Sequence, residues 1–224
     1  MPLRVTSLCR YFANRSIQWR PEDFDAYKWV QALKGKQLNG YGYVPVAGVR
    51  KRLSNQNLAS AVDWFAKLAA QHLAKKRMAG PFIIIPVPNS SCIAASSVAP
   101  RTRRLARVIA EELRDGSIVA DCLRWKRNLG SASEEGGPRA PEILYGNLVV
   151  LEDLLQDLDD ELAVLLVDDV TTSGGHLRAC AAKLRESGVD VAHALCGGKT
   201  VYDQDEGAFA ILEETLDDFE RALA

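Results

Sequence analysis

Hydrophobic and polar positions after residue 80 follow two alternating patterns. Short runs of apolar residues occupy 82–85, 118–120, 148–151 and 162–167, and a run interrupted only by His193 occupies 191–196, whereas apolar residues recur every three or four positions over 101–114 and 174–187. Continuous apolar runs are typical of strands buried on both faces, and the longer spacing is typical of amphipathic helices. The alternation predicts an α/β fold with a mainly parallel, doubly wound sheet flanked by helices.

The first 80 residues are predicted to be mostly helical. Pro21, Glu22 and Asp23 begin a helix that ends near residue 33, because proline and acidic residues favour the first turn. A second helix follows Ser54, an N-cap residue type, and carries apolar residues at helical spacing as far as residue 73. We therefore divide the chain into an N-terminal helical or hood segment, residues 1–80, and an α/β domain, residues 81–224. Residues 212–223 are expected to form an acidic amphipathic helix.

Composition narrows the class of protein. The chain of 224 residues is 47% hydrophobic and 25% charged, with 16 Gly, 9 Pro and 5 Cys, which excludes collagen-like, disordered and disulfide-scaffold classes. No apolar run approaches the roughly 20 residues that span a bilayer, and the first residues lack a secretory pattern. We expect a cytoplasmic protein with no membrane partner. The cysteines form no CxxC pair, so we expect buried thiols and no structural zinc.

Charge is divided unevenly along the chain. Residues 1–130 carry 22 Lys and Arg against 8 Asp and Glu, whereas residues 131–224 carry 6 against 21. The net charge is nevertheless −1. One interpretation is a basic surface for nucleic acid or a polyphosphate. The other, which we favour slightly, is that the two halves fold together and their charges intermix.

The segment 164–176 carries the most specific chemical pattern. An apolar run delivers Asp168 and Asp169 to the end of a predicted strand, and a short Thr/Ser/Gly loop follows before a helix begins. The unbonded N–H groups of a first helical turn, together with the loop hydroxyls, form a cradle for a phosphate. The neighbouring carboxylates would repel a phosphate but would hold sugar hydroxyls or a metal. The pattern therefore indicates a ligand with a phosphate at one end and a diol beside it.

This segment resembles the phosphoribosyl-pyrophosphate (PRPP) binding motif of type I phosphoribosyltransferases, with its apolar run, paired acids and Thr-Thr-Ser-Gly-Gly. The resemblance implies that Asp168 and Asp169 hold the ribose 2′- and 3′-hydroxyls and, through them, Mg²⁺ as the cofactor. It also implies that the loop binds the 5-phosphate through Thr171, Thr172, Ser173, Gly174, Gly175 and His176. His176 stands where the family usually has threonine. A generic strand–loop–helix turn with solvated acids is the alternative interpretation.

The resemblance extends over about residues 80–200. Pro88, Asn89, Ser90 and Ser91 follow the first strand of this region and look like the family's pyrophosphate loop. The order of Pro-Val-Pro, a basic helix and a later motif-bearing strand is most similar to the competence-protein-F (ComF-like) branch. The chain departs from that branch in lacking a four-cysteine zinc ribbon and in carrying residues 93–100 in place of Arg-Gly-Phe-Asn-Gln. A simple strand terminator is the alternative for Asn89 to Ser91.

Residues 124–145 are polar and have no hydrophobic period. The resemblance places here the family's flexible catalytic loop, in which Arg124, Lys126, Arg127 and Arg139 would close over the leaving pyrophosphate. An ordinary solvated loop is an equal alternative.

Two further residues are placed on the base side of the expected site. Lys199 follows a predicted strand, and Trp125 lies in the long loop, where it could stack on a base. The sequence Gly197-Gly198-Lys199-Thr200 looks like the end of a phosphate-binding Walker A loop, but the first glycine of that motif would fall at His193.

The function that this resemblance implies is transfer of the phosphoribosyl group of PRPP to a nitrogenous base with release of pyrophosphate. Asp168 and Asp169 would face the cationic sugar in the transition state, and Thr172 occupies a position where some purine-specific members carry a catalytic carboxylate. The expected partners are PRPP and a small-molecule base, with nucleic acid and a second copy of the chain left open. A non-catalytic regulator that binds PRPP or a nucleotide, and an accessory protein of DNA uptake or repair, are the alternatives.

Overall fold

The centre of the protein is a seven-stranded sheet. The computed structural model describes residues 1–14, 16–130, 140–155 and 162–218. Strands run in the order β11-β1-β10-β9-β5-β6, with β2 pairing to the end of β10, and every neighbouring pair is parallel except β1 with β11. Their bounds are β1 Leu3–Ser7, β2 Arg10–Phe12, β5 Phe82–Pro86, β6 Ile118–Val119, β9 Ala163–Thr171, β10 Val191–Val201 and β11 Leu212–Leu216. The predicted α/β fold with a mainly parallel sheet is confirmed.

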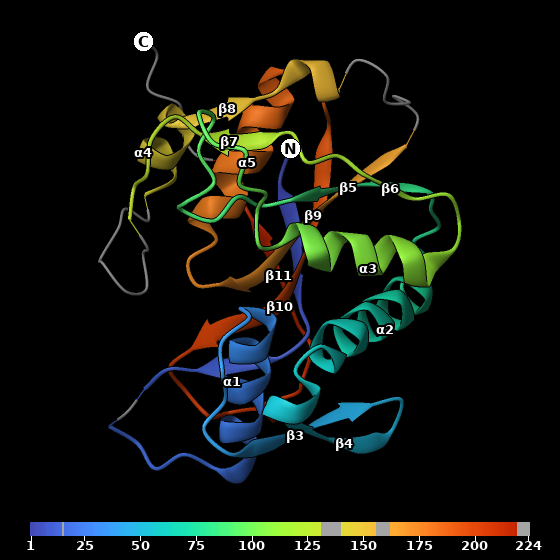
Figure 1. Cartoon of the computed structure of the whole chain (residues 1–224), viewed down its shortest axis with the longest axis vertical. Helices are drawn as coiled ribbons and strands as arrows, with labels where there is room; N and C mark the ends of the chain where they lie inside the picture. Colours follow the sequence, from blue (N-terminus) through green and yellow to red (C-terminus); the bar gives the residue numbers. More distant parts are fainter. Residues whose placement is uncertain (15, 131–139, 156–161, 219–224) are drawn as a thin grey trace.

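The two faces of the sheet bury different helices. On β9, Leu165 and Val167 pack into one apolar cluster, while Val164 and Leu166 pack into another, because successive side chains of a strand point to opposite faces. Figure 1 shows helices on both sides of the sheet. The first cluster contains residues of α1 (Pro21–Leu33), α2 (Ser60–Lys75) and α3 (Arg103–Leu113), and the second contains residues of α4 (Pro141–Gly146) and α5 (Gly175–Glu186).

The N-terminal 80 residues contribute to this same sheet. β1 and β2 pair with β10, which lies after the expected division at residue 80. The two sides of that division therefore share one sheet. Helices α1 and α2 follow the predicted positions. Between them, β3 (Tyr41–Val46) and β4 (Val49–Ser54) form a hairpin, and a 3₁₀ turn, η1 (Asn55–Asn57), leads into α2.

Part of the region expected to be a long loop is regular structure. β7 (Leu123–Trp125) pairs with β8 (Leu148–Val150) in a small antiparallel sheet, and α4 lies between them along the chain. A 3₁₀ turn, η2 (Glu152–Leu154), follows β8. Leu123 and Trp125 of β7 are almost completely buried and belong to the second apolar cluster. The start of this region therefore packs into the core and is not an exposed loop.

The C-terminal segment corrects one prediction. Residues 212–216 form β11 rather than the start of an amphipathic helix, and they pair antiparallel with β1. Alternate side chains of β11 are half-buried. Among them, Glu214 forms an ion pair at 2.6 Å with Lys199 of β10, which lies two strands away in the sheet. Side chains that alternate between half-buried and exposed suit a strand at the edge of a sheet. The backbone hydrogen bonds to β1 stabilise this strand more than the helical spacing of its apolar residues stabilises a helix. Residues 219–223 of the expected helix lie outside the described residues.

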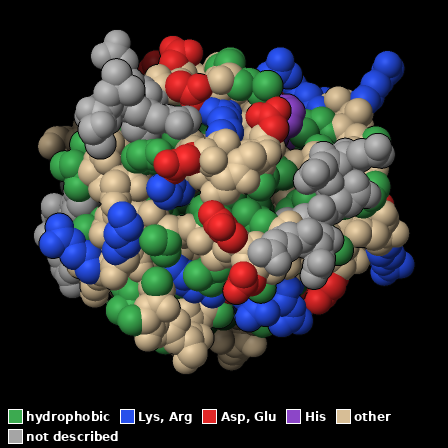
Figure 2. Space-filling view, turned by 90° about the horizontal axis from the view of Figure 1, so that it is seen from above, with side chains coloured by type: hydrophobic (Ala, Val, Ile, Leu, Met, Phe, Trp, Pro, Cys, Tyr) green, Lys and Arg blue, Asp and Glu red, His purple; other side chains and the backbone are tan. Residues whose placement is uncertain are grey.

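The surface carries both signs of charge. Acidic and basic side chains are interspersed over the face in Figure 2, in keeping with the interpretation that the two oppositely charged halves intermix. Among the described residues, no helix is both long and apolar enough to cross a membrane.

Candidate functional site

A cavity of about 480 Å³ opens where the carboxyl ends of β5 and β9 lie side by side. The chain leaves β5 toward β6 on one side and leaves β9 toward β10 on the other, so the two loops diverge at this point. Such a switch point leaves a crevice at the sheet edge, where α/β proteins bind ligands. Residues 88–91 line one wall and residues 168–176 line another, so the structure brings together the two loops that the sequence singled out.

The paired aspartates lie at the floor of this cavity. Asp169 is 2% exposed, and its Oδ2 accepts hydrogen bonds from Nε and Nη2 of Arg101 at 2.9 and 2.5 Å. Asp168 Oδ1 accepts the backbone N–H of Asp169 at 2.8 Å. Burial and the adjacent Asp169 carboxylate raise the pKa of Asp168 well above its ordinary value, while Arg101 and Lys34 oppose that rise. A cation or hydroxyl donor at this position would therefore be bound favourably.

The loop after β9 has the backbone of an anion cradle. Gly174 adopts φ +76°, and a Cβ there would lie 2.2 Å from Cδ1 of Leu216 in β11, so glycine is required on two grounds. Among the described residues, no protein group accepts a hydrogen bond from the backbone N–H of Ser173 or Gly174. Helix α5 begins at Gly175, so its positive end points at the same place. The Thr172 hydroxyl lies 3.0 Å from that of Thr200.

The loop after β5 is held in place by three side chains. The indole Nε1 of Trp125 donates to the carbonyl oxygens of Pro88 and Asn89, both at 3.1 Å. The Asn89 side chain accepts the backbone N–H of Arg101 at 2.8 Å, and Thr102 donates to the Val87 carbonyl at 2.6 Å. These contacts hold the loop after β5 in place, because the carbonyl groups of Val87, Pro88 and Asn89 are each engaged by a donor.

Trp125 therefore corrects the expectation of a base-stacking residue. Its side chain is 1% exposed, so neither ring face is open to a ligand. The ring instead lies between the two loops, with its centroid 5.6 Å from that of His176 in an edge-to-face arrangement. Trp125 supports both cavity walls from behind.

Lys199 also differs from its expected place. Its ammonium group contacts both carboxylate oxygens of Glu214, at 2.6 and 2.7 Å, and Lys199 is not among the described residues that line the cavity. Gly197 and Gly198, which precede Lys199, allow close packing against neighbouring elements. A Cβ at Gly197 would lie 2.4 Å from Leu33 of α1 and 2.7 Å from the Asp169 carbonyl, so this glycine lets α1 approach β9 and β10.

The basic residues of the expected flexible loop are mostly engaged elsewhere. Arg124 pairs with Asp121 at 2.6 Å, and both side chains are 12% exposed. Lys126 donates to the Gly146 carbonyl at 2.8 Å. Arg124, Lys126 and Arg127 are not among the described residues that line the cavity, and Arg139 lies outside the described residues.

Several residues of the cavity wall were not predicted as site residues. Those with a charged or aromatic side chain are Tyr11, Lys34, Lys36, Arg101 and Tyr202. Arg101 directly follows a Pro-containing loop and lies just before the basic helix α3, a signal that could have placed it at the sheet edge. The others come from β2, from the end of α1 and from the segment after β10, and only the tertiary fold shows that these meet. Burial lowers the pKa of Lys34, and Asp169 opposes that shift.

The acidic pair alone does not make a closed metal site. Among the described residues there is no group of three or more His, Cys, Asp or Glu side chains that could hold a metal ion. Asp168 and Asp169 supply two carboxylates, and Arg101 already occupies one oxygen of Asp169. Hard divalent cations take six or more oxygen ligands. The residues present therefore fit Mg²⁺ only when a ligand supplies further oxygen atoms.

Of three comparisons with known proteins, only the one with solved structures found similar chains. No family model matches the chain, and no curated protein matches it. Among solved structures, the chain is similar to a hypoxanthine phosphoribosyltransferase from Staphylococcus aureus, with 11% identity, TM-score 0.39 and coverage of 63% of this chain and 73% of that one.

Two adenine phosphoribosyltransferases are similar to the same degree. The Saccharomyces cerevisiae enzyme, solved with adenine and an imino-altritol bisphosphate, has 12% identity, TM-score 0.39 and coverage of 77% and 89%. The Trypanosoma brucei enzyme, solved with AMP, pyrophosphate and ribose-5-phosphate, has 13% identity, TM-score 0.40 and coverage of 88% and 87%.

Proposed function

We propose that this protein is a phosphoribosyltransferase, which binds PRPP and transfers its phosphoribosyl group to a nitrogenous base with release of pyrophosphate. One observation carries the proposal: a left-handed glycine loop at a helix start, a buried pair of aspartates and a second loop at the adjacent strand end surround a single cavity of about 480 Å³. A phosphate, a diol and a diphosphate at fixed separations match these three features in that order.

Each wall has a separate task in this proposal. The N–H groups of Ser173 and Gly174 and the start of α5 bind the 5-phosphate. Asp168 and Asp169 accept hydrogen bonds from the ribose hydroxyls, which fixes the sugar ring over the cavity floor. As the bond from C1 to the diphosphate oxygen lengthens, positive charge grows on the ring, and the same carboxylates stabilise it.

The leaving group and the acceptor meet the other walls. The diphosphate faces residues 88–91 and the guanidinium of Arg101, which supplies positive charge beside that loop. Mg²⁺, held by Asp168 and Asp169 together with ligand oxygens, would supply further charge neutralisation. The acceptor faces Tyr11 and Tyr202, which also line the cavity. Thr172 has no ionisable group and contacts Thr200, so it positions the loop rather than taking a proton from the base.

Pyrophosphate release tests the proposal. PRPP and Mg²⁺ are incubated with the protein and a panel of purines, pyrimidines and carboxylated aromatic bases, and pyrophosphate is measured by a coupled assay. We expect release that depends on one class of base and falls at least 100-fold in the Asp168→Asn, Asp169→Asn double variant. Base-independent or absent release would reject transfer, and PRPP binding without release would favour the regulator.

A further inference from the structure

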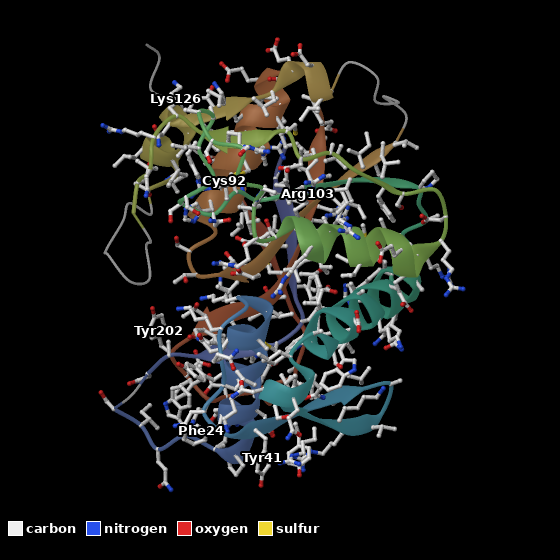
Figure 3. The ribbon with its side chains drawn as sticks, in the orientation of Figure 1. Phe24, Tyr41, Cys92, Arg103, Lys126 and Tyr202 are labelled. Carbon is white, nitrogen blue, oxygen red and sulfur yellow. The ribbon has the colours of Figure 1, made fainter. Side chains whose placement is uncertain are left out.

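A second cavity, of about 640 Å³, lies between the end of α1 and the start of α3. Four arginines line it together with Gly35 and Pro100: Arg101, Arg103, Arg104 and Arg107. Arg103 lies at the N-terminal end of α3 (Figure 3). We refer to this space as the arginine cavity and to the site at β5 and β9 as the substrate cavity. Four guanidinium groups around one space form a strong attraction for an anion.

The arginines are only partly neutralised by the protein. Arg103 lies 3.8 Å from Asp121, and Arg107 lies 3.3 Å from Glu111 in a pair whose side chains are both 64% exposed. Exposed pairs of this kind contribute little, so an anion can replace them. Arg104 is fixed by donating to the carbonyls of Ala32 and Leu33, at 3.0 and 2.6 Å. Burial and the nearby Arg101 guanidinium lower the pKa of Arg104, which shows that positive charge is crowded here.

Arg101 belongs to both cavities. Its side chain lines the arginine cavity and also donates two hydrogen bonds to Asp169 Oδ2 on the floor of the substrate cavity. The side chain is 38% exposed, so it has room to move, whereas its backbone N–H is held by Asn89. An anion on one side and Asp169 on the other would compete for the same guanidinium.

We propose that the arginine cavity is a binding site for a small oligophosphate anion, and that occupancy weakens ligand binding in the substrate cavity through Arg101. The coupling rests on the function proposed above, whereas the anion site itself does not. Guanidinium groups bind phosphate oxygens through paired hydrogen bonds, and several of them favour a ligand with more than one phosphate. The volume lies within the roughly 300–1,000 Å³ typical of small-molecule sites.

The sign of the coupling follows from charge. When an oligophosphate holds Arg101, the substrate cavity loses a positive charge, and a second anion now lies close to it. Both effects weaken the binding of an anionic substrate. They outweigh the gain that comes from freeing Oδ2 of Asp169 to accept a hydrogen bond from the substrate. Because coupling between two binding sites is reciprocal, a substrate phosphate must weaken oligophosphate binding by the same factor.

Direct calorimetric titration tests the site. Inorganic tripolyphosphate and adenosine triphosphate are the probes, and they distinguish an inorganic from a nucleotide source of the phosphates. Arg103→Gln with Arg107→Gln should weaken tripolyphosphate binding at least 10-fold, because both residues line the arginine cavity and neither lines the substrate cavity. The control, Lys75→Gln with Arg77→Gln at the end of α2, removes the same charge from exposed positions and should change affinity less than 2-fold. Equal loss in both variants, or in neither, would overturn the site.

A second titration separates coupling from competition. Ribose 5-phosphate is titrated at increasing tripolyphosphate, and the apparent dissociation constant should rise about 3–10-fold and then level off. A rise without limit would mean that both ligands share the substrate cavity and would overturn the coupling. If ribose 5-phosphate does not bind at all, the proposed function fails, while the direct titration still decides the anion site. An oligothymidylate that binds more tightly than tripolyphosphate, and loses affinity in the Arg103, Arg107 variant, would overturn the small-ligand assignment in favour of nucleic acid.

Discussion

At the scale of single residues, the buried carboxyl group of Asp168 lowers the stability of the fold when it ionises. Its raised pKa means that ionisation costs more in the folded chain than in the unfolded one. The sign follows directly: Asp168 favours folding at pH values below the ordinary carboxylate pKa, and that contribution is lost as pH rises through the raised pKa. At neutral pH the ionisation of Asp168 therefore opposes folding.

Asp168→Asn should raise the melting temperature at pH 7. The amide keeps the shape of the side chain and removes the repulsion from Asp169, for a gain on the order of 1 kcal/mol, or roughly 2–4 °C. Thermal unfolding followed by circular dichroism at pH 7 and at pH 4 measures this. The gain should shrink at pH 4, which is close to the ordinary pKa of 3.8 that Asp168 has in the unfolded chain, and a variant less stable than wild type at pH 7 would contradict the assignment.

The same raised pKa predicts a proton change on ligand binding. Sugar hydroxyls and cations both bind the ionised carboxylate, so binding should release up to about one proton at a pH near the raised value. Calorimetry with Mg²⁺ and PRPP in two buffers of different ionisation enthalpy counts this proton. Affinity should also fall as pH is lowered through the raised pKa of Asp168. Proton uptake, or affinity that increases on acidification, would contradict it.

At the scale of elements, the site consists of two loops on strand ends that are pinned from behind. Trp125 of β7 holds residues 88–89, and Leu216 of β11 packs against Gly174. Strands outside the β5–β9 pair therefore set the shape of both loops.

Trp125→Phe should loosen the loop after β5. The substitution keeps an aromatic ring but removes the donor to two carbonyls, at a cost of roughly 1–3 kcal/mol. Affinity for pyrophosphate should fall more than affinity for ribose 5-phosphate, because only the former depends on residues 88–91. Calorimetry with the two ligands compares them, and an equal loss for both would show that Trp125 acts on the fold as a whole.

Gly174→Ala should be more harmful than Gly188→Ala. Both glycines have positive φ, +76° and +83°, but a Cβ at Gly188 meets nothing within 4 Å, whereas one at Gly174 meets Leu216. Gly188→Ala should cost about 1 kcal/mol of backbone strain and leave phosphate binding unchanged. Gly174→Ala should cost more and weaken ribose 5-phosphate at least 10-fold. Chemical denaturation and calorimetry on both variants give the comparison, which equal effects would contradict.

At the scale of the whole molecule, the features that could be predicted from the sequence are those that depend on local hydrophobic pattern and periodicity. The alternation of apolar runs and helical stripes was sufficient for the parallel sheet, and the aspartate and glycine loop lies at the strand end where the pattern put it. The edge strand β11 was missed because Leu212 and Leu216 also fit helical spacing. Arg101 and Lys34 were missed because they reach the cavity from just before α3 and just after α1, and pairwise contacts across the fold leave no periodic signal in the chain.

Ribose 5-phosphate binding to the intact protein is the most direct measurement of the central idea, since this ligand carries only the phosphate and the diol that the loop and the aspartates are inferred to bind. Isothermal titration calorimetry compares the wild-type protein with the Asp168→Asn, Asp169→Asn variant, whose fold is checked by circular dichroism. We predict saturable one-to-one binding by wild type and a loss of at least 10-fold in the variant. Equal affinity in the two proteins, or no binding by the wild type, would contradict the account.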